Sequence, residues 1–197
     1  MSDASFGLIV FLRYPELGKV KTRLAKTLGE EEALLIYEEL TAMTLSVASH
    51  YSHTCYLFYE GRLPAENKKK DNFKYHLQAT GNLGTKMIDA IEYVLSKHSK
   101  AIIIGSDSPS LSKEIIDKAV SQLDMYDIVI GPSQDGGYYL LGCKEMMPSL
   151  FENIPWSTPE VMNKTINNIQ KLGKTFTLLK TLIDIDEAED WISYKKS

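Results

Sequence analysis

The stretch of sequence that most constrains the fold is residues 101–109. Three consecutive isoleucines at 102–104 end at Gly105, and Asp107 and Pro109 follow at once. A short apolar run that ends at a glycine is typical of a parallel strand buried on both faces. Pro109 keeps the residue before it extended, so no helix begins early. In open α/β sheets this end of a strand carries the ligand site, where a hard carboxylate suits a divalent cation, and the cation suits a phosphate.

Other strand-like and helix-like segments alternate with this one along the chain. This alternation indicates the α/β class, with buried parallel strands and helices between them. The expected strands cover residues 7–12, 54–59, 73–77, 127–131, 138–142, 176–179 and 182–185. The expected helices begin near Val20, at Glu30 (to Ala48), after Gly84, at Leu111, near residues 157–158 (to about Leu172) and near the end of the chain.

Length and composition limit the class of protein. The 197 residues suffice for one domain over residues 1–197, and no linker interrupts them. The net charge of −4 argues against a general nucleic-acid binder, which would carry a basic surplus. The longest apolar runs span about five residues, far below the ~20 needed to cross a bilayer.

Cysteine usage and the amino terminus both point to the cytoplasm. Cys55 and Cys143 lie 88 positions apart, each inside an apolar run, which predicts buried thiols in a reducing compartment. Residues 1–5 show no basic region followed by an apolar one, so no signal peptide is expected.

A basic loop follows the first expected strand. Between residues 13 and 26 five basic residues accompany one acid, a local charge of +4 in a chain of −4. Most charge runs are solvated surface, but this loop opens on the ligand edge of the sheet. An early helical turn would bring Lys19 and Arg23 onto one face, near free backbone N–H groups. The loop therefore predicts a phosphate site, although it lacks the glycine and Lys-Ser/Thr pair of a Walker loop.

Two further loops end at the same edge. Gly81 and Gly84 lie three apart between a strand and a helix, where glycine lets a backbone approach a ligand or a neighbouring element closely. Asp135 lies in the glycine-rich segment 131–137, and Asp-Gly is also a strong hairpin-turn signal. A turn and a ligand contact are compatible, because loops on a rigid sheet often carry function.

The carboxyl-terminal segment 184–190 contains five acids in seven residues. One interpretation is the acid-rich first turn of the last helix, which the helix dipole favours. Only Asp184 and Asp186, at the end of an expected strand, are candidates for anything more.

Five sets of residues, in this order, resemble one family. They are residues 11–15 with 18–24, 78–87, 105–109, 131–132 with 135–142, and 156–158. Together they resemble a small bacterial family assigned as glycosyltransferases, the "transferase 1" proteins associated with radical-SAM and selenium-domain clusters. That family lies in the nucleotide-diphospho-sugar transferase superfamily. The resemblance implies the GT-A fold, a three-layer α/β/α sandwich with a mostly parallel central sheet. The chain is also similar, more distantly, to the guanylyltransferases that make phospholactate and molybdenum cofactors, which are wider relatives of that family.

The resemblance also implies roles for single residues. Asp107 matches the superfamily's metal-binding aspartate, as one Asp rather than an Asp-x-Asp pair. The tail resembles an Asp-Val-Asp-Thr-Pro-Glu-Asp pattern in which an aspartate supplies a second metal contact; Asp186 is retained, while Glu187 and Ala188 replace Thr-Pro. Lys86 stands where the family often has arginine, which keeps the charge and loses the planar fork.

The loops and the resemblance together predict one site that binds a nucleotide or nucleotide-sugar donor and an acceptor. Asp107 with Asp186 or Asp184 would hold Mg²⁺ or Mn²⁺. From its position alone, Asp135 is expected to act as the base for an acceptor hydroxyl. The expected nucleotide and phosphate ligands are Arg13, Lys19, Lys21, Arg23, Gly84 and Lys86.

Three functions stay open on the sequence. Glycosyl transfer from a nucleotide-diphosphate sugar follows the family name. Nucleotidyl transfer with release of pyrophosphate suits a basic loop directly after the first strand. A nucleotide-binding protein without turnover would explain the single aspartate and the small size.

Overall fold

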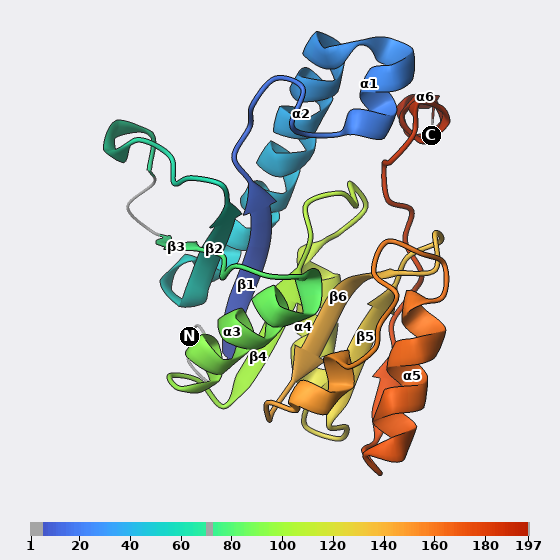
Figure 1. Cartoon of the computed structure of the whole chain (residues 1–197). Helices are drawn as coiled ribbons and strands as arrows, with labels where there is room; N and C mark the ends of the chain where they lie inside the picture. The colour runs from blue at the N-terminus through green and yellow to red at the C-terminus, as the bar shows by residue number, and fades with distance from the viewer. Residues whose placement is uncertain (1–5, 70–72, 197) are drawn as a thin grey trace.

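The structure, a computed structural model, describes residues 6–69 and 73–196 (Figure 1). Residues 1–5, where no signal peptide was expected, lie outside the described residues. Seven strands form one sheet in the order β3-β2-β1-β4-β6-β5-β7. The strands are β1 (Phe6–Arg13), β2 (Cys55–Glu60), β3 (Lys74–Leu77), β4 (Lys100–Ile104), β5 (Ile128–Pro132), β6 (Tyr138–Cys143) and β7 (Phe176–Leu178).

Six α-helices and three short 3₁₀ turns connect these strands in the described part of the chain. The α-helices are α1 (Thr22–Leu28), α2 (Glu30–Ala48), α3 (Leu83–Leu95), α4 (Lys113–Gln122), α5 (Val161–Lys171) and α6 (Ala188–Lys196). The 3₁₀ turns are η1 (Ser49–Thr54), η2 (Glu66–Lys68) and η3 (Pro148–Phe151). None of the described helices is long and apolar enough to span a bilayer.

The sheet is mostly parallel, as predicted. Strand β1 pairs in parallel with β2 on one side and with β4 on the other, so that Leu8 lies between Cys55 and Ile102. Strand β6 alone runs against its neighbours, β4 and β5. Because the chain leaves β1 in one direction and returns to its other side at β4, the carboxyl ends of these two strands flank a topological switch point.

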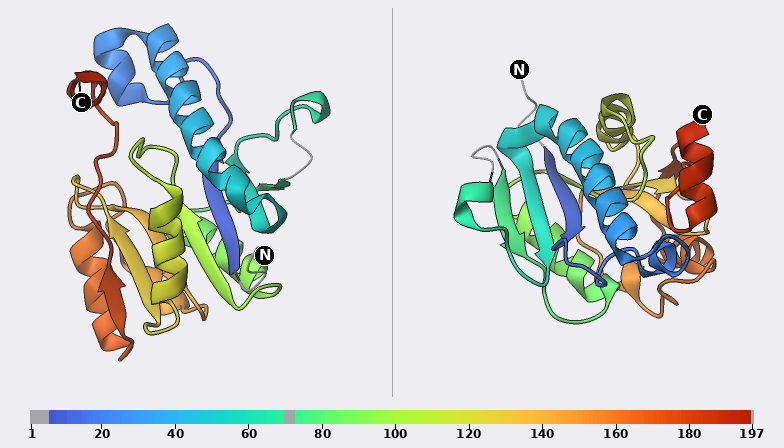
Figure 2. Two further views of the ribbon diagram at one scale, coloured as in Figure 1. Left: turned by 180° about the vertical axis from the view of Figure 1, so that it is seen from behind. Right: turned by 90° about the horizontal axis from the view of Figure 1, so that it is seen from above.

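Alternate side chains of the strands pack on opposite faces of the sheet. Leu8, Val10 and Leu12 lie in one core cluster with residues of α2 and α4, whereas Ile9 lies in the other with residues of α3 and α5. Figure 2 shows the two helix pairs on the two faces. The result is the expected three-layer α/β/α sandwich. Both cysteines are buried and unpaired, also as expected.

A third, smaller cluster lies beyond the carboxyl edge of the sheet. It joins α1, α2 and α6 through Leu24, Ile36 and Trp191, and it includes Ile185 of the carboxyl-terminal segment. Figure 1 shows α6 beside α1, although the two helices lie at opposite ends of the chain. This cluster ties the tail to the loop that follows β1.

Several helix starts and one strand differ from the sequence predictions. Helix α4 begins at Lys113 rather than at Leu111, and α5 begins at Val161 rather than near residues 157–158. The first helix begins at Thr22 rather than near Val20, because Lys21 adopts a left-handed backbone (φ 47°, ψ 46°) that no helix can include. Residues 182–185 are not a strand, because only Leu182 forms a bridge, to Ser133. At this bridge the N–H of Leu182 donates to the carbonyl oxygen of Pro132 and the N–H of Gln134 donates to that of Leu182.

The contact between β1 and α3 predicts a specific loss of stability. A Cβ at Gly7 would lie 2.4 Å from Val94 Cγ1, so Gly7→Ala overpacks a central strand. We expect the variant to lose about 1–3 kcal/mol of unfolding free energy in urea titrations. Gly105→Ala is the matched control, because a Cβ there meets nothing within 4 Å. Equal losses in the two variants would contradict this account of the packing.

Candidate functional site

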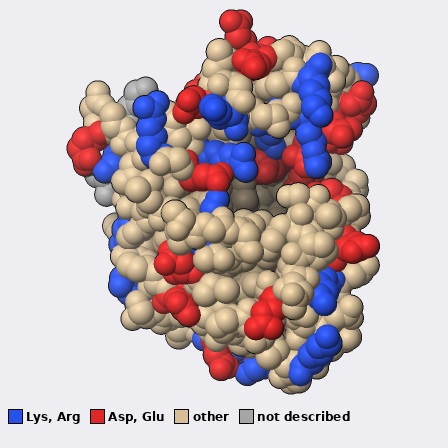
Figure 3. Space-filling model, in the orientation of Figure 1, with Lys and Arg blue, Asp and Glu red and all other residues tan. Residues whose placement is uncertain are grey.

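The switch point opens into a cleft of about 910 Å³. It lies beyond the carboxyl ends of β1 and β4 and beside the β5–β6 hairpin. In Figure 3 basic and acidic side chains gather around this hollow. The cleft brings together most of the residues that the sequence singled out, namely Arg13, Lys21, Arg23, Lys86, Asp107, Asp135, Asp184 and Asp186.

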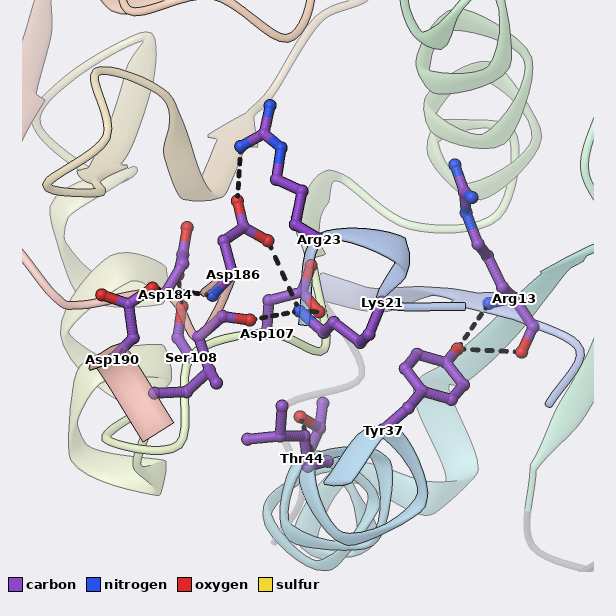
Figure 4. Close-up of polar contacts among 12 residues, drawn as sticks. Arg13, Lys21, Arg23, Tyr37, Thr44, Asp107, Ser108, Asp184, Asp186 and Asp190 are labelled. Carbon is purple, nitrogen blue, oxygen red and sulfur yellow. Dashed lines mark hydrogen bonds and ion pairs between the residues drawn. The ribbon is translucent and has the colours of Figure 1, made fainter. Parts of the chain in front are cut away.

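The side chain of Lys21 lies at the centre of the charged residues (Figure 4). Its Nζ is 2.5 Å from Asp107 Oδ1, 2.5 Å from the carbonyl oxygen of Ile185 and 3.6 Å from Asp186 Oδ1. Only 6% of this side chain is exposed. The left-handed backbone of Lys21 precedes α1, whose Leu24 is fully buried. One ammonium group therefore joins the loop after β1, the loop after β4 and the tail.

The tail is held in place by Ile185. Its side chain is fully buried, and its backbone N–H donates to the carbonyl oxygen of Asp107 at 2.9 Å. The carboxylate of Asp190 accepts from the N–H groups of Asp186 and Glu187, which caps the start of α6. Much of the acid-rich tail therefore has the helix-starting role considered from the sequence, while Asp184 and Asp186 line the cleft.

Arg23 approaches the same carboxylates from α1. Its Nη1 lies 3.6 Å from Asp186 Oδ2, and 56% of its side chain is exposed. An exposed guanidinium at the edge of the cleft can turn toward an incoming anion at little cost. Lys21 and Arg23 therefore share a carboxylate but differ in exposure.

Asp184 is a partly buried carboxylate of the cleft. The hydroxyl of Ser108 donates to its Oδ1. Burial raises the pKa of Asp184 to about 6, the Ser108 hydrogen bond opposes this rise, and the charges of Asp107 and Asp135 add to it. Ser108, next to Asp107 in sequence, thus connects the β4 loop to the tail a second time.

Asp135 lies in the turn of the β5–β6 hairpin. Its Oδ1 accepts from Ser133 Oγ at 2.5 Å and from the N–H of Gly137 at 2.9 Å. Gly136 has a positive φ of 89°, and a Cβ there would overlap the backbone of Pro159. The hairpin-turn interpretation is therefore confirmed, and the same carboxylate still lines the cleft.

The opposite end of the cleft holds a second group of charges. Glu60, at the end of β2, forms an ion pair with Arg13, whose Nε lies 2.9 Å from its Oε2, and accepts a hydrogen bond from Lys86 Nζ. The hydrogen bond from Lys86 is the main cause that holds the pKa of Glu60 below its usual value. Tyr37 of α2 fixes the end of β1, because its hydroxyl accepts from the N–H of Arg13 and donates to its carbonyl oxygen. Arg13 and Lys86 thus border the cleft as a group partly neutralised by Glu60.

Two residues predicted for the site lie elsewhere. Lys19 belongs to a turn in which its N–H donates to the carbonyl oxygen of Glu16. It lines an adjoining cleft of about 460 Å³, which shares Arg13 and Glu60 with the main cleft. It does not share a helical face with Arg23, because α1 begins only at Thr22. Gly84 is buried under Trp156, whose Cζ2 would be 3.1 Å from a Cβ there, so its missing side chain serves packing.

The carboxylates of the cleft fit a divalent cation that arrives with phosphates. Asp107 Oδ1 and Asp186 Oδ1 face one point, since both contact Lys21 Nζ. In residues 6–69 and 73–196 no three His, Cys, Asp or Glu side chains form a group that could hold a metal alone. Mg²⁺ commonly binds through one or two carboxylates and completes its shell with substrate phosphates. Asp107 and Asp186 would hold it, with Asp184 beside them.

Comparison with known proteins places the chain in a family. Residues 43–158 match the family described as "uncharacterized protein conserved in bacteria (DUF2064)". The chain belongs to this family. The matched segment contains Lys86, Asp107 and Asp135, whereas Lys21, Arg23 and the tail lie outside it. A search of curated proteins finds no match.

Solved structures with the same fold include several transferases. A protein from Desulfovibrio desulfuricans G20, provisionally described as a nucleotide-diphospho-sugar transferase, has a TM-score of 0.90 and 26% identity, over 98% of this chain and 87% of its own. A cytidylyltransferase from Leptospira borgpetersenii serovar Hardjo-bovis (strain JB197) gives 0.59 and 13%, over 97% and 85%. Rv0371c from Mycobacterium tuberculosis H37Rv, solved in complex with manganese, gives 0.61 and 12%, over 98% and 99%. The fold is that of the nucleotide-diphospho-sugar transferase superfamily, as the resemblance implied.

Sequence reasoning missed Ile185, Ser108 and Tyr37, which position the charged groups. The sequence does mark Ile185, because an apolar residue between Asp184 and Asp186 indicates a buried anchor in an acidic segment. No feature of the sequence distinguishes Ser108 from an ordinary loop serine or Tyr37 from an ordinary core tyrosine.

The pKa of Asp184 predicts how stability changes with pH. The folded state holds this proton up to about pH 6, whereas an unfolded aspartate loses it near pH 3.9. Ionised Asp184 therefore costs stability as pH rises through this window. Asp184→Asn removes the cost, so we expect a gain of up to about 2–3 kcal/mol at pH 7.5 that vanishes at pH 4. Urea titrations at both pH values, without divalent cations, measure it; a less stable variant at pH 7.5 would refute it.

Proposed function

We propose that the protein is a metal-dependent transferase that uses a nucleotide-activated donor, with a nucleotide-diphosphate sugar as the preferred substrate. The observation that carries this proposal is the meeting of Lys21 and Arg23 with Asp107 and Asp186 at the switch point of the sheet. Phosphates that bind beside carboxylates need cationic side chains and a metal ion to offset the negative charge. A nucleotide diphosphate can contact both the cationic side chains and the metal at this edge of the sheet. The likeness to the D. desulfuricans protein supports the sugar donor.

Each group in the cleft has a role in this proposal. Asp107 and Asp186 hold Mg²⁺ or Mn²⁺, which when bound neutralises charge that develops on the departing diphosphate. Lys21 and Arg23 bind the phosphates, since an ammonium and an exposed guanidinium both donate charge-assisted hydrogen bonds to phosphate oxygens. Asp135, held by Ser133 and Gly137, accepts the proton of the acceptor hydroxyl. Arg13 and Lys86 stabilise the nucleotide end.

Nucleotidyl transfer is the second candidate. In this reaction the acceptor attacks the α-phosphate of a nucleoside triphosphate and expels pyrophosphate. The observation that favours it is the basic loop directly after β1, which suits three phosphates as well as two. The likeness to a cytidylyltransferase points the same way. A protein that binds nucleotides without turnover is the third outcome that the experiments below distinguish.

A thermal-shift screen of nucleotides and nucleotide sugars, with and without Mn²⁺, tests the proposed ligand. We expect the true donor with Mn²⁺ at a hundredfold its Kd to raise the Tm by about 5–10 °C. Asp107→Asn should abolish the Mn²⁺-dependent part of this shift. Asp89→Asn is the control, because Asp89 lies on α3 and does not line the cleft. No shift with any nucleotide in the unmodified protein would overturn the proposal.

The released product distinguishes the two reactions. With the donor that the screen identifies and a panel of hydroxyl acceptors, glycosyl transfer releases a nucleoside diphosphate, and nucleotidyl transfer releases pyrophosphate. We expect the nucleoside diphosphate, and enzyme-coupled assays detect each product separately. Pyrophosphate release would establish the second candidate, and binding without either product would favour the non-catalytic protein.

A further inference from the structure

The ammonium of Lys21 lies where two carboxylates of the cleft point. Asp107 Oδ1 is 2.5 Å and Asp186 Oδ1 is 3.6 Å from Nζ, and the carbonyl oxygen of Ile185 is a third acceptor at 2.5 Å. Carboxylate and carbonyl oxygens of this kind are also the ligands that hard divalent metal ions bind. The two carboxylates thus already have a cation between them, and it belongs to the protein.

This position is more enclosed than a surface ion pair requires. The side chain of Lys21 is 6% exposed, whereas those of Asp107 and Asp186 are 44% and 36% exposed. The carboxylates are therefore much more open to solvent than the lysine side chain that pairs with them. The left-handed backbone of Lys21 is rare for a residue with a side chain, and it sits between the buried residues Val20 and Leu24. The loop thus holds this lysine at the carboxylates.

We propose that Lys21 occupies the place of the divalent cation, and that the cation enters only when the phosphates of the donor draw Lys21 away. This inference rests on the proposed function and adds to it an order of events. A cation at Asp107 and Asp186 would be repelled by an ammonium within a few ångströms of it. Removing the ammonium without a new partner would leave a buried charge uncompensated. A diphosphate removes both obstacles, because its oxygens pair with the displaced ammonium and also ligate the metal.

Lys21 is in this respect a positioning residue that couples metal binding to nucleotide binding. Without nucleotide, it keeps the carboxylates of two distant segments together and keeps metal out. With nucleotide, it becomes a phosphate ligand. Arg23 does not have this role, because its guanidinium reaches Asp186 alone and is mostly exposed.

Binding of Mn²⁺ alone, with no nucleotide present, tests the inference. The loss of free Mn²⁺ signal in electron paramagnetic resonance gives the affinity directly. We expect Lys21→Met to bind Mn²⁺ at least about tenfold more tightly than the unmodified protein, because the competing charge is gone. Adding Asp107→Asn to Lys21→Met should remove the gain. A purely structural lysine would instead give unchanged or weaker binding.

Lys19→Met is the matched control, since it removes one positive charge from the same loop at a residue that lines the adjoining cleft and not the main one. Lys21→Gln is the second variant, because its amide can still donate to the carbonyl oxygen of Ile185. Unchanged Mn²⁺ affinity in both Lys21 variants, or an equal gain in Lys19→Met, would overturn the inference. Failure of both Lys21 variants to fold would also overturn it, because an ammonium that must leave cannot be one without which the chain does not fold.

The result is separable from the test of the proposed function. If the unmodified protein binds a nucleotide with Mn²⁺ but Lys21→Met gains no Mn²⁺ affinity, only the inference fails. If no nucleotide binds at all, the proposed function fails, whatever Mn²⁺ does in the variants.

Discussion

The parallel pairing of β1 with both β2 and β4 is the constraint on which the site depends. Register places Val10 beside Ile104, the last residue of β4, and β1 continues three residues further to Arg13. The loop after β1 and the loop after β4 both leave the carboxyl edge of the sheet and face each other across the switch point. Lys21 and Asp107, 86 positions apart in sequence, meet because the sheet has this order. The antiparallel insertion of β6 between β4 and β5 then brings the hairpin with Asp135 to the same edge.

The third side of the cleft comes from packing rather than from the sheet. Ile185 is fully buried among Leu24, Ile36 and Trp191, and the residues on either side of it, Asp184 and Asp186, line the cleft. Burying one isoleucine of this kind contributes about 1.5–3 kcal/mol, enough to hold a short tail segment against carboxylate repulsion. The electrostatics of the cleft thus depend on a small apolar cluster outside the main core.

The sequence predicted the sheet better than the site. Apolar runs such as residues 102–104 are unambiguous, because a buried parallel strand admits little else, and a carboxylate directly after one points to the ligand edge. The sequence predicted that Lys21 binds an anion but not that it pairs with Asp107. This pairing depends on the left-handed backbone of Lys21, which lies between the buried residues Val20 and Leu24 and which no glycine in the sequence marks. The same backbone delays α1 and separates Lys19 from Arg23. Residues 182–185 were expected as a strand, but their burial does not alternate, since Leu182 and Ile185 are both buried while Ile183 is exposed.

Because the cationic and anionic side chains of the cleft already pair with one another, a ligand that carries only one sign of charge should bind less well than one that carries both. An isolated cation must displace Lys21, and an isolated phosphate must approach Asp107, Asp184 and Asp186, so each alone meets like charge in the cleft. A metal–diphosphate pair satisfies the carboxylates and the two cationic side chains together. By linkage, whatever factor the phosphates contribute to metal affinity, the metal contributes to phosphate affinity. Under the proposed function, the ion pair at Lys21 would therefore favour the complete donor over its parts, with no contact to base, sugar or acceptor required.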